Sequence, residues 1–244
     1  MGQKRIYRQS LGNRHLSGYR VCVKETDLWV QTQKPLESLV REYILRFRGY
    51  IETYIASNPG FYAAMAPVRV SGFEPGIIRH MAEAARAANV GPMAAVAGAV
   101  AEYVGKALLD ASSEVMIENG GDVFVKLDKP FTLAIDAGKS PFTDKIGLQL
   151  DASAHSLGVC TSSGTIGHSF SYGQADAVCV VSDCCVLADA AATAIGNQVT
   201  AAGDIDRAIA LGRNIEGVSG IAVIVGDRIG VWGDVSVVPI TIRK

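Results

Sequence analysis

Charge of either sign is scarce in this chain. Lysine, arginine, aspartate and glutamate together make up 19% of the 244 residues, and the formal net charge is -1. A nucleic-acid-binding protein usually carries a basic patch, so we expect no nucleic-acid partner. Apolar residues make up 49% of the chain, which is enough for a substantial core. Because so few charges remain for the surface, we expect a homo-oligomer.

Long apolar runs are also missing. The first thirty residues contain no continuous apolar segment of the kind found in a secretory signal. No stretch reaches the roughly 18 apolar residues that a membrane span needs. The run from Ala94 to Val104 is short, and Glu102 and Lys106 interrupt it. We therefore expect a cytoplasmic protein with no membrane partner.

The cysteines follow no metal-binding or disulfide pattern. Their number is odd, no Cys-x-x-Cys spacing occurs, and they lie at Cys22, Cys160, Cys179, Cys184 and Cys185. This argues against a disulfide framework and against a structural zinc site, and it favours reduced cytosolic thiols. The adjacent pair at 184 and 185 has a redox or nucleophilic interpretation, but small buried filler is the preferred one.

Apolar periodicity predicts the secondary structure. The predicted helices are Pro35–Ser57, Pro75–Ala88, Met93–Asp110, Leu187–Ile195 and Ile205–Leu211, the last with Asp204 as its N-cap. Asn58-Pro59-Gly60 is expected to stop the first of them. The predicted strands are Tyr19–Val23, Leu28–Thr32, Val68–Val70, Val115–Ile117, Val123–Lys126, Thr132–Asp136, Ile146–Leu150, Leu157–Cys160, Ala175–Ser182, Gly220–Val225, Ile229–Trp232 and Val235–Ile242, with a hairpin-like end.

The order of these elements favours an α+β fold. Strands and helices do not alternate one by one, which disfavours a doubly wound parallel sheet. No Gly/Ser-rich linker divides the chain. We expect either one domain over residues 1–244 or two closely joined α+β halves. The helix over Met93–Asp110 consists largely of alanine and glycine, and we expect it to be central and tightly packed.

The first candidate site is Asn119-Gly120-Gly121-Asp122, between two predicted strands. Asn-Gly is a strong hairpin-turn signal, so a turn alone explains part of the motif. The second glycine also permits close approach of the backbone to a ligand, and Asp122 adds a carboxylate at the end of the strand pair. A turn alone and a turn that is also a site both remain open.

The second candidate site is the pair Asp189 and Thr193. These residues are four apart on an alanine-rich helix, so they project from one face. A carboxylate and a hydroxyl suit a hard cation, which prefers oxygen ligands. The alternative is a solvent-facing aspartate with a threonine hydrogen-bonded to its own helix.

The third candidate site is the loop that begins at Thr161-Ser162-Ser163-Gly164 and reaches His168. Hydroxyl groups and flexible backbone can surround phosphate oxygens with O–H and N–H donors. No Gly-Lys-Ser/Thr follows, so the loop is not a Walker loop. His168 is a candidate acid, base or phosphate contact, and an ordinary loop histidine is the alternative.

These stretches, in this order, resemble the ApbE family of FAD:protein FMN transferases. The family's Asn-x-Gly-Gly-Asp turn matches Asn119–Asp122, and its Thr-Ser-Gly loop matches Thr161–Gly164. Its Ala-Asp-Ala-x-x-Thr-Ala helix, the most specific motif, matches Ala188–Ala194. The resemblance covers roughly residues 60 to 200.

The resemblance implies a T-fold-like architecture of antiparallel sheets and packed helices. It also implies binding of a flavin dinucleotide, with magnesium held partly by Asp189 and Thr193, and transfer of FMN to a protein threonine. Asp122 and His168 are the implied catalytic candidates. The cofactor-binding candidates are Asn119, Gly120, Gly121, Asp122, Thr161, Ser162, Ser163 and Gly164.

Two family features are missing from this chain. The family's Gly-Gly-Ile-Ala-Lys-Gly helix start is replaced by Ala94-Ala95-Val96-Ala97-Gly98-Ala99, so its lysine is absent. The family's His-Ile-x-Asp-Pro-x-Thr-Gly segment is absent too, with His168 as the one histidine that matches it in position. Both features contribute groups expected around the flavin and its phosphates.

The chain is more similar to a reduced, uncharacterised cytosolic branch of the family, found in methanogens and sulfate reducers. That branch has been associated with incorporation of sulfide into homocysteine in anaerobes. Three functions follow as expectations. The first is binding of a flavin or related nucleotide with magnesium, the second is a non-catalytic oligomeric scaffold, and the third is an FMN transferase acting on a cytosolic protein.

Overall fold

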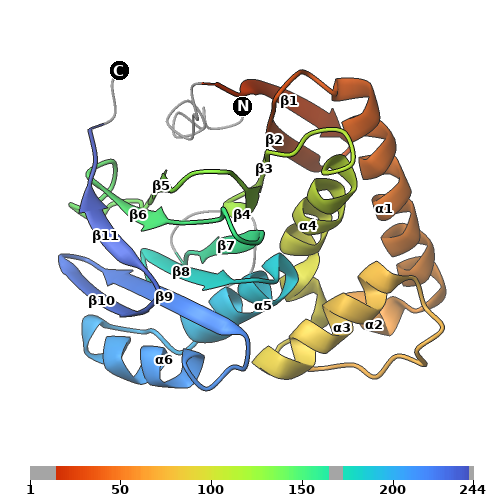
Figure 1. The fold of residues 1–244 in the computed structure, drawn as a ribbon. Coiled ribbons are helices and arrows are strands. Elements are labelled where there is room, and N and C mark those ends of the chain that lie inside the picture. Colours follow the sequence, from red (N-terminus) through yellow and green to blue (C-terminus); the bar gives the residue numbers. More distant parts are fainter. Residues whose placement is uncertain (1–14, 165–172, 242–244) are drawn as a thin grey trace.

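An eight-stranded antiparallel sheet runs through the middle of the molecule (Figure 1). The computed structural model describes residues 15–164 and 173–241. Neighbouring strands follow the order β1 (Ser17–Val23), β2 (Thr26–Thr32), β3 (Val115–Asn119), β4 (Asp122–Lys126), β7 (Leu157–Ser162), β8 (Ala177–Ser182), β9 (Val218–Val225) and β10 (Arg228–Gly233). A smaller antiparallel sheet has the order β11 (Ser236–Pro239), β6 (Ile146–Leu150) and β5 (Phe131–Ala134).

Helices cover one face of the large sheet, and the small sheet covers part of the other (Figure 1). The helices are α1 (Glu37–Ser57), α2 (Pro59–Ala63), α3 (Gly76–Ala88), α4 (Val96–Leu108), α5 (Cys185–Gly196) and α6 (Ile205–Gly212), with 3-10 turns at Pro92–Ala95 and Ala202–Asp204. Side chains alternate between the two faces of a strand. On β4, Phe124 therefore joins the helix-side core, while Val123 and Val125 join the core under the small sheet.

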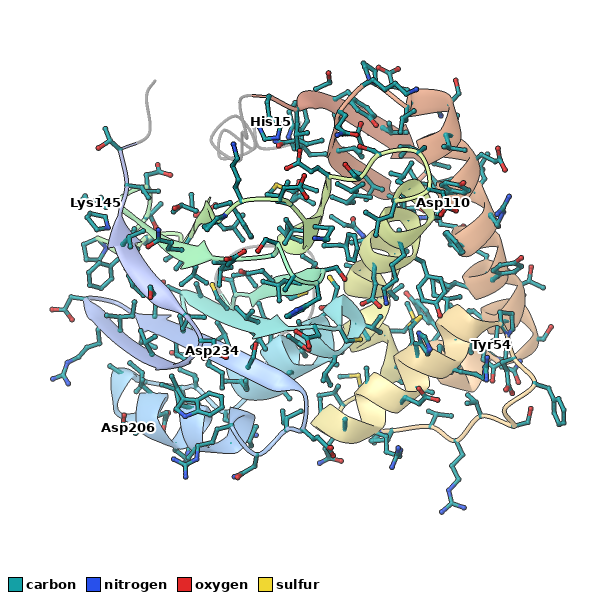
Figure 2. The ribbon with its side chains drawn as sticks, in the orientation of Figure 1. His15, Tyr54, Asp110, Lys145, Asp206 and Asp234 are labelled. Carbon is teal, nitrogen blue, oxygen red and sulfur yellow. The ribbon has the colours of Figure 1, made fainter. Side chains whose placement is uncertain are left out.

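Small residues bring α4 and α5 close to each other and to the sheet. A Cβ atom added at Gly98 of α4 would overlap the carbonyl oxygen of Cys185. One added at Gly158 of β7 would overlap the backbone of the same cysteine, and one at Gly105 would overlap the ring of Phe124. Side chains fill the space between these elements (Figure 2). The expectation of a central, tightly packed small-residue helix is confirmed.

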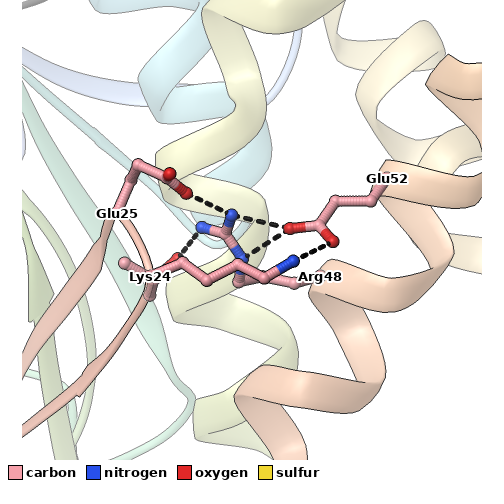
Figure 3. A network of polar contacts seen from close by, with 5 residues as sticks. Lys24, Glu25, Arg48 and Glu52 are labelled. Atoms are coloured by element: carbon pink, nitrogen blue, oxygen red, sulfur yellow. Dashed lines mark hydrogen bonds and ion pairs between the residues drawn. The ribbon is translucent and has the colours of Figure 1, made fainter.

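The turn between β1 and β2 is held against α1 by charged side chains (Figure 3). The guanidinium of Arg48 lies 2.5 Å from Glu25 and 2.7 Å from Glu52, and it also donates to the hydroxyl of Thr26. Lys24 lies 2.6 Å from Glu52. Arg48 is mostly buried, with 17% of its side chain exposed, so this network orders the hairpin more firmly than isolated surface pairs do.

A second polar contact ties the start of the described chain to the sheet. His15, labelled in Figure 2, places its Nε2 2.7 Å from the carboxylate of Glu114. Glu114 is buried and also accepts the amide hydrogen of Asp128. Hydrogen bonds from that amide and from His15 hold the pKa of Glu114 below its usual range despite its burial.

One local prediction is wrong, one is confirmed and one holds only in part. Residues Val68–Val70 form no strand but part of an extended connection before α3. Asn58-Pro59-Gly60 stops the first helix as predicted, since α1 ends at Ser57, and the short helix α2 then begins at Pro59 because proline suits the first turn of a helix. Asp204 occupies the N-cap position of α6 as predicted, but its carboxylate does not cap that helix and instead accepts hydrogen bonds from the Thr200 hydroxyl and from the Thr200 and Ala201 amides.

The end of the chain also differs from the hairpin-like prediction. β9 and β10 do form an antiparallel hairpin around Gly226. The next strand, β11, is shorter than the predicted Val235–Ile242 and pairs with β6 in the small sheet. The α+β class with antiparallel sheets and packed helices is confirmed. No helix in the described part of the chain combines the length and apolar character needed to cross a bilayer.

Candidate functional site

Asp122 is the first residue of β4 and faces the helix side of the sheet. Its residue exposure is 8%, and its cross-strand partner on β7 is Cys160. The carboxylate accepts hydrogen bonds from the Cys160 thiol and from the Thr161 amide. Burial, and then the nearby negative charge of Asp189, hold the pKa of Asp122 well above its usual range.

Asp189 lies on the second turn of α5 and is equally buried, with 9% exposure. Its Oδ2 accepts the amide hydrogen of Gly98 at 2.8 Å, and the Ala97 amide also donates to the carboxylate. Asp189 therefore caps the N-terminus of α4 from a neighbouring helix. Burial outweighs these hydrogen bonds and raises the pKa of Asp189 to about 7.

The structure thus brings together two candidate residues that lie 67 positions apart in the sequence. In the described ranges, neither Asp122 nor Asp189 takes part in an ion pair with a lysine or arginine. Two desolvated carboxylates without a cationic side chain disfavour each other's charged form. A bound cation would remove this repulsion, because hard divalent ions take carboxylate oxygens as ligands.

A third buried carboxylate, Glu102 of α4, completes a reciprocal arrangement. Its Oε2 accepts the amide hydrogens of Cys185 at 2.6 Å and Val186 at 3.2 Å, which are the first two residues of α5. Its Oε1 accepts a hydrogen bond from Lys106 at 2.6 Å. Each helix therefore carries the carboxylate that caps the N-terminus of the other. The two caps fix the position of Asp189 relative to α4.

The Asn119–Asp122 motif forms the turn between β3 and β4. Gly120 and Gly121 have φ angles of +73° and +118°, which favour glycine. The side-chain Nδ2 of Asn119 donates to the carbonyl oxygen of Ala97 at 3.0 Å, so the turn also holds the start of α4. The side chain of Glu118 accepts the Gly121 amide hydrogen. The turn therefore holds Asp122 beside α4.

The Thr161–Gly164 segment reaches the site through its backbone more than through its hydroxyls. The Thr161 side chain points to the opposite face of the sheet, where its Oγ1 lies 3.2 Å from the thiol of Cys179. Ser162 alternates back to the face of Asp122. Gly164 packs tightly against Gly173 and donates its amide hydrogen to Ala175. The two stems of the loop therefore meet, and His168 lies outside the described residues.

Thr193 belongs to the same stripe of α5 as Asp189. Cys185, at one end of the stripe, touches Cys160 on β7, and Gly196, at the other end, packs against Gly173. This stripe therefore runs alongside β7 and the loop stems, with Thr193 half-buried within it. The expected pairing of Asp189 and Thr193 on one helix face is consistent with this geometry.

The thiols around the site are buried and of low reactivity. Cys160 and Cys185 are fully buried with their Sγ atoms 3.5 Å apart. Burial raises the pKa of Cys160 well above its usual range, and the pKa of Cys185 is raised to about 11 despite its hydrogen bond with Cys160. Cys184 is half-buried rather than buried, and burial raises its pKa to about 11. Thiolate, the reactive form, is therefore disfavoured at all three positions.

Sequence reasoning missed two residues of the site. Glu102 appeared only as a charge interrupting an apolar run, yet a glutamate within an alanine and glycine helix is a signal for a buried polar partner. Cys160 carried no signal, since its contact with Asp122 depends on the β4–β7 register. In residues 15–164 and 173–241, no three or more histidine, cysteine, aspartate or glutamate side chains form a metal-binding group by themselves.

Comparisons of the sequence match most of this chain to known proteins. Residues 8–222 match the family model described as "AbpE bacteria". A UPF0280 protein of Methanococcus aeolicus is 38% identical over 223 residues, which cover 88% of this chain and 90% of the relative. A UPF0280 protein of Methanocaldococcus jannaschii is 39% identical over 222 residues, with the same shares of each chain covered.

Solved structures show the same fold at low sequence identity. The apo flavinyl transferase ApbE of Pseudomonas stutzeri superposes with a TM-score of 0.56 and 14% identity, covering 89% of this chain and 94% of that one. The ApbE protein of Thermotoga maritima gives a TM-score of 0.52 and 14% identity, covering 88% and 96%. These likenesses establish the T-fold-like, ApbE-like architecture that the motifs predicted.

Proposed function

We propose that this chain, which belongs to the AbpE bacteria family, binds a flavin nucleotide together with a divalent cation between β4 and α5. The observation that carries the proposal is the buried pair Asp122 and Asp189: the charge of Asp189 lies near enough to raise the pKa of Asp122, and neither forms an ion pair among the described residues. Proteins of similar structure include the flavinyl transferase ApbE of Pseudomonas stutzeri and the flavin transferase ApbE of Vibrio cholerae, which supports a flavin as the nucleotide.

The two carboxylates are the residues that would hold the cation. Magnesium usually keeps several waters and takes one or two protein carboxylates plus substrate phosphates. A site with only two acidic ligands therefore suits it better than a closed protein cage does. Thr193, on the same helix stripe as Asp189, is the candidate for a further oxygen ligand. When bound, magnesium would neutralise pyrophosphate charge and polarise its phosphorus–oxygen bonds.

The chain's own groups make nucleotide binding depend on the cation. A helix N-terminus is a common phosphate-binding site because its amide hydrogens are free. Here Asp189 takes the amide hydrogen of Gly98 at the start of α4, and Glu102 takes those of Cys185 and Val186 at the start of α5. The family's lysine is absent as well. The positive charge for a pyrophosphate must therefore come with the ligand.

The glycine turn and the serine segment are the candidate nucleotide contacts. A Cβ atom added at Gly120 would meet no other atom within 4 Å, so the turn leaves open space on that side. Ser162 lies on the Asp122 face of β7. These groups would orient a nucleotide whose phosphates lie near the two carboxylates. In this proposal Asp122 is an ionised ligand of the cation, whose positive charge would offset the burial and the repulsion from Asp189 that otherwise raise its pKa.

The thiols do not support a sulfur-carrying role for this chain. The link of the resembling branch to homocysteine synthesis would need either an accessible, ionisable thiol or a partner that handles sulfide. The three cysteines nearest the site are buried or half-buried with raised pKa values. If the chain acts in sulfur assimilation, we propose that it does so through its nucleotide site and a partner protein.

Flavin fluorescence tests the proposal. Purified full-length protein is titrated into FAD and, separately, FMN, with magnesium or with a chelator, and anisotropy is recorded. We expect binding only with magnesium, and its loss in Asp122→Asn. The matched control, Asp227→Asn in the exposed turn before β10, should bind as the unchanged protein does. Absence of binding in both conditions would contradict the proposal.

A non-catalytic role is the second candidate, and one observation favours it. Asp189 is already used structurally, since it caps α4 through the Gly98 amide. A scaffold would keep this cap without any ligand. Supplying FAD, magnesium and a threonine-containing acceptor protein separates the functions, because transfer of FMN adds its mass to the acceptor and a scaffold leaves the acceptor unchanged.

A further inference from the structure

Phe73 is presented to solvent by a well-defined turn. Its residue exposure is 97%, the highest of the large apolar residues in the described ranges. The neighbouring Glu74 carboxylate accepts the Ser71 amide at 2.8 Å, the Ser71 hydroxyl at 2.8 Å and the Gly72 amide at 2.7 Å. The hydrogen bond from the Ser71 amide is the main reason that the pKa of Glu74 is lowered to about 2. The ring thus projects from an ordered turn just before α3.

A surface cleft of about 240 Å³ lies at the other end of α3. Its apolar lining includes Ala87, Val90, Leu211 and Ile215. Carboxamide side chains, but no charged ones, complete the lining. The exposed residue Met65 lies nearby, since its backbone is close to Gly91. The cleft has the volume to receive an aromatic ring, which would meet both apolar and carboxamide side chains there.

We propose that a second copy of this chain covers this surface, with Phe73 of each copy inserted in the cleft of the other. Phe73 lies just before the N-terminus of α3, and the cleft lies at the C-terminus of the same helix. The two features are therefore separated by the length of α3. That length is about 20 Å for 13 residues. A two-fold axis across α3 makes the helices antiparallel and brings each Phe73 to the partner's cleft.

The charges on the outer face of α3 fit the same arrangement. Arg79 and Glu83 are exposed, and neither takes part in an ion pair among the described residues. The stripe they form continues to Ala87 in the cleft. An axis level with Met81 places Arg79 opposite the partner subunit's Glu83. The same register brings the N-terminal end of α3, with Phe73 just before it, to the C-terminal end of the partner's helix, where the cleft lies.

In this register the surface is complementary to a second copy of itself. A partner of another kind would not require that property. Two ion pairs form across the axis, one on each side of it, and two aromatic rings fill the two clefts. Stable homodimers bury on the order of 800 Å² per subunit, so the contact has to extend along the whole of α3 and its flanking turn. The exposed Tyr62 and Met65 lie in the segment before that turn and are available to widen it.

Sedimentation velocity of the full-length protein tests the proposal over a concentration series. We expect a dimer, and we expect Phe73→Asp to raise its dissociation constant by on the order of 30-fold or more, as loss of an aromatic anchor does. Leu45→Asp on α1, which removes another exposed apolar side chain, is the matched control and should stay dimeric. Circular dichroism should show unchanged folding in both variants.

Charge exchange gives the register-specific readout. Arg79→Glu alone should weaken the dimer, and the double variant Arg79→Glu with Glu83→Arg should restore it. A monomer at all concentrations would overturn the proposal, and so would a dimer that Phe73→Asp leaves intact or a double variant no stronger than the single one. A monomer whose cleft binds a small molecule instead would also overturn it.

Discussion

The N-termini of α4 and α5 are capped in the same way but differ in charge. At α5, Glu102 accepts two amide hydrogens and also has Lys106 at 2.6 Å. At α4, Asp189 accepts amide hydrogens and instead faces a second carboxylate, Asp122. The first cap is balanced by the protein's own lysine, whereas no lysine or arginine forms an ion pair with the second in the described ranges.

This difference separates a structural carboxylate from a candidate binding one. Burial of a charge without a partner is costly, and proteins keep such arrangements mainly where function requires them. Glu102 needs nothing beyond the protein to explain its position. For the pair Asp122 and Asp189 we propose a divalent cation as the partner, because it has the right charge and ligand preference.

Removing the balanced cap should have the largest effect on stability. Glu102→Ala leaves the buried amides of Cys185 and Val186 without acceptors, and we expect it to lower the free energy of unfolding by about 3 kcal/mol. Glu102→Gln, which keeps an acceptor oxygen, should cost less. Urea denaturation measures both. Equal losses in the two variants would show that the hydrogen bonds do not carry the effect.

The unbalanced pair should make the cation-free protein less stable as pH rises. Because the folded protein holds the Asp189 proton up to about pH 7 and the unfolded chain releases it near pH 4, stability falls across that window. Asp122→Asn removes the neighbouring charge and should stabilise the protein at pH 8 by about 1–2 kcal/mol, while leaving it little changed at about pH 4. Urea midpoints across pH test this, and parallel curves for the two proteins would contradict it.

Removing the balancing lysine should have the smallest effect. Lys106 is half-exposed, with 53% of its side chain accessible, so water screens its interaction with Glu102. We expect Lys106→Met to lower the free energy of unfolding by less than about 1 kcal/mol. The measurement is the same denaturation experiment. A loss as large as that of Glu102→Ala would mean that the charge pair, not the cap, holds α5.

Sequence periodicity and motif order predicted the fold class and most elements. The apolar stripe on α1 and the glycine turn at Asn119–Asp122 are determined by residues close together in the sequence. Sequence patterns therefore predict both. The hydrogen-bond partners of the Asp204 carboxylate were not predictable in this way. A carboxylate at this position can accept hydrogen bonds from the preceding turn as easily as from the following helix. Residues Val68–Val70 form no strand because, among the residues that the structure describes, no other strand lies beside them to pair with, and the sequence alone does not show whether such a partner is present.

The candidate site was predictable in its members more than in its geometry. Family motifs pointed to Asp122 and Asp189, but their burial and mutual repulsion depend on how close α5 lies to β7, through Gly158 and Cys185. The Thr161 hydroxyl was expected at the site, and the strand register turns it to the other face. Contacts set by long-range packing have no local pattern from which to read them.

Binding of the cation alone tests the central claim most directly. Isothermal titration of magnesium into the nucleotide-free protein at pH 8 should show one site per chain, lost in Asp122→Asn and kept in Lys106→Met. Folding of both variants is checked by circular dichroism. Equal binding by the protein and by Asp122→Asn, or no binding by either while FAD still binds with a chelator present, would contradict the assignment of Asp122 and Asp189 as the cation-binding pair.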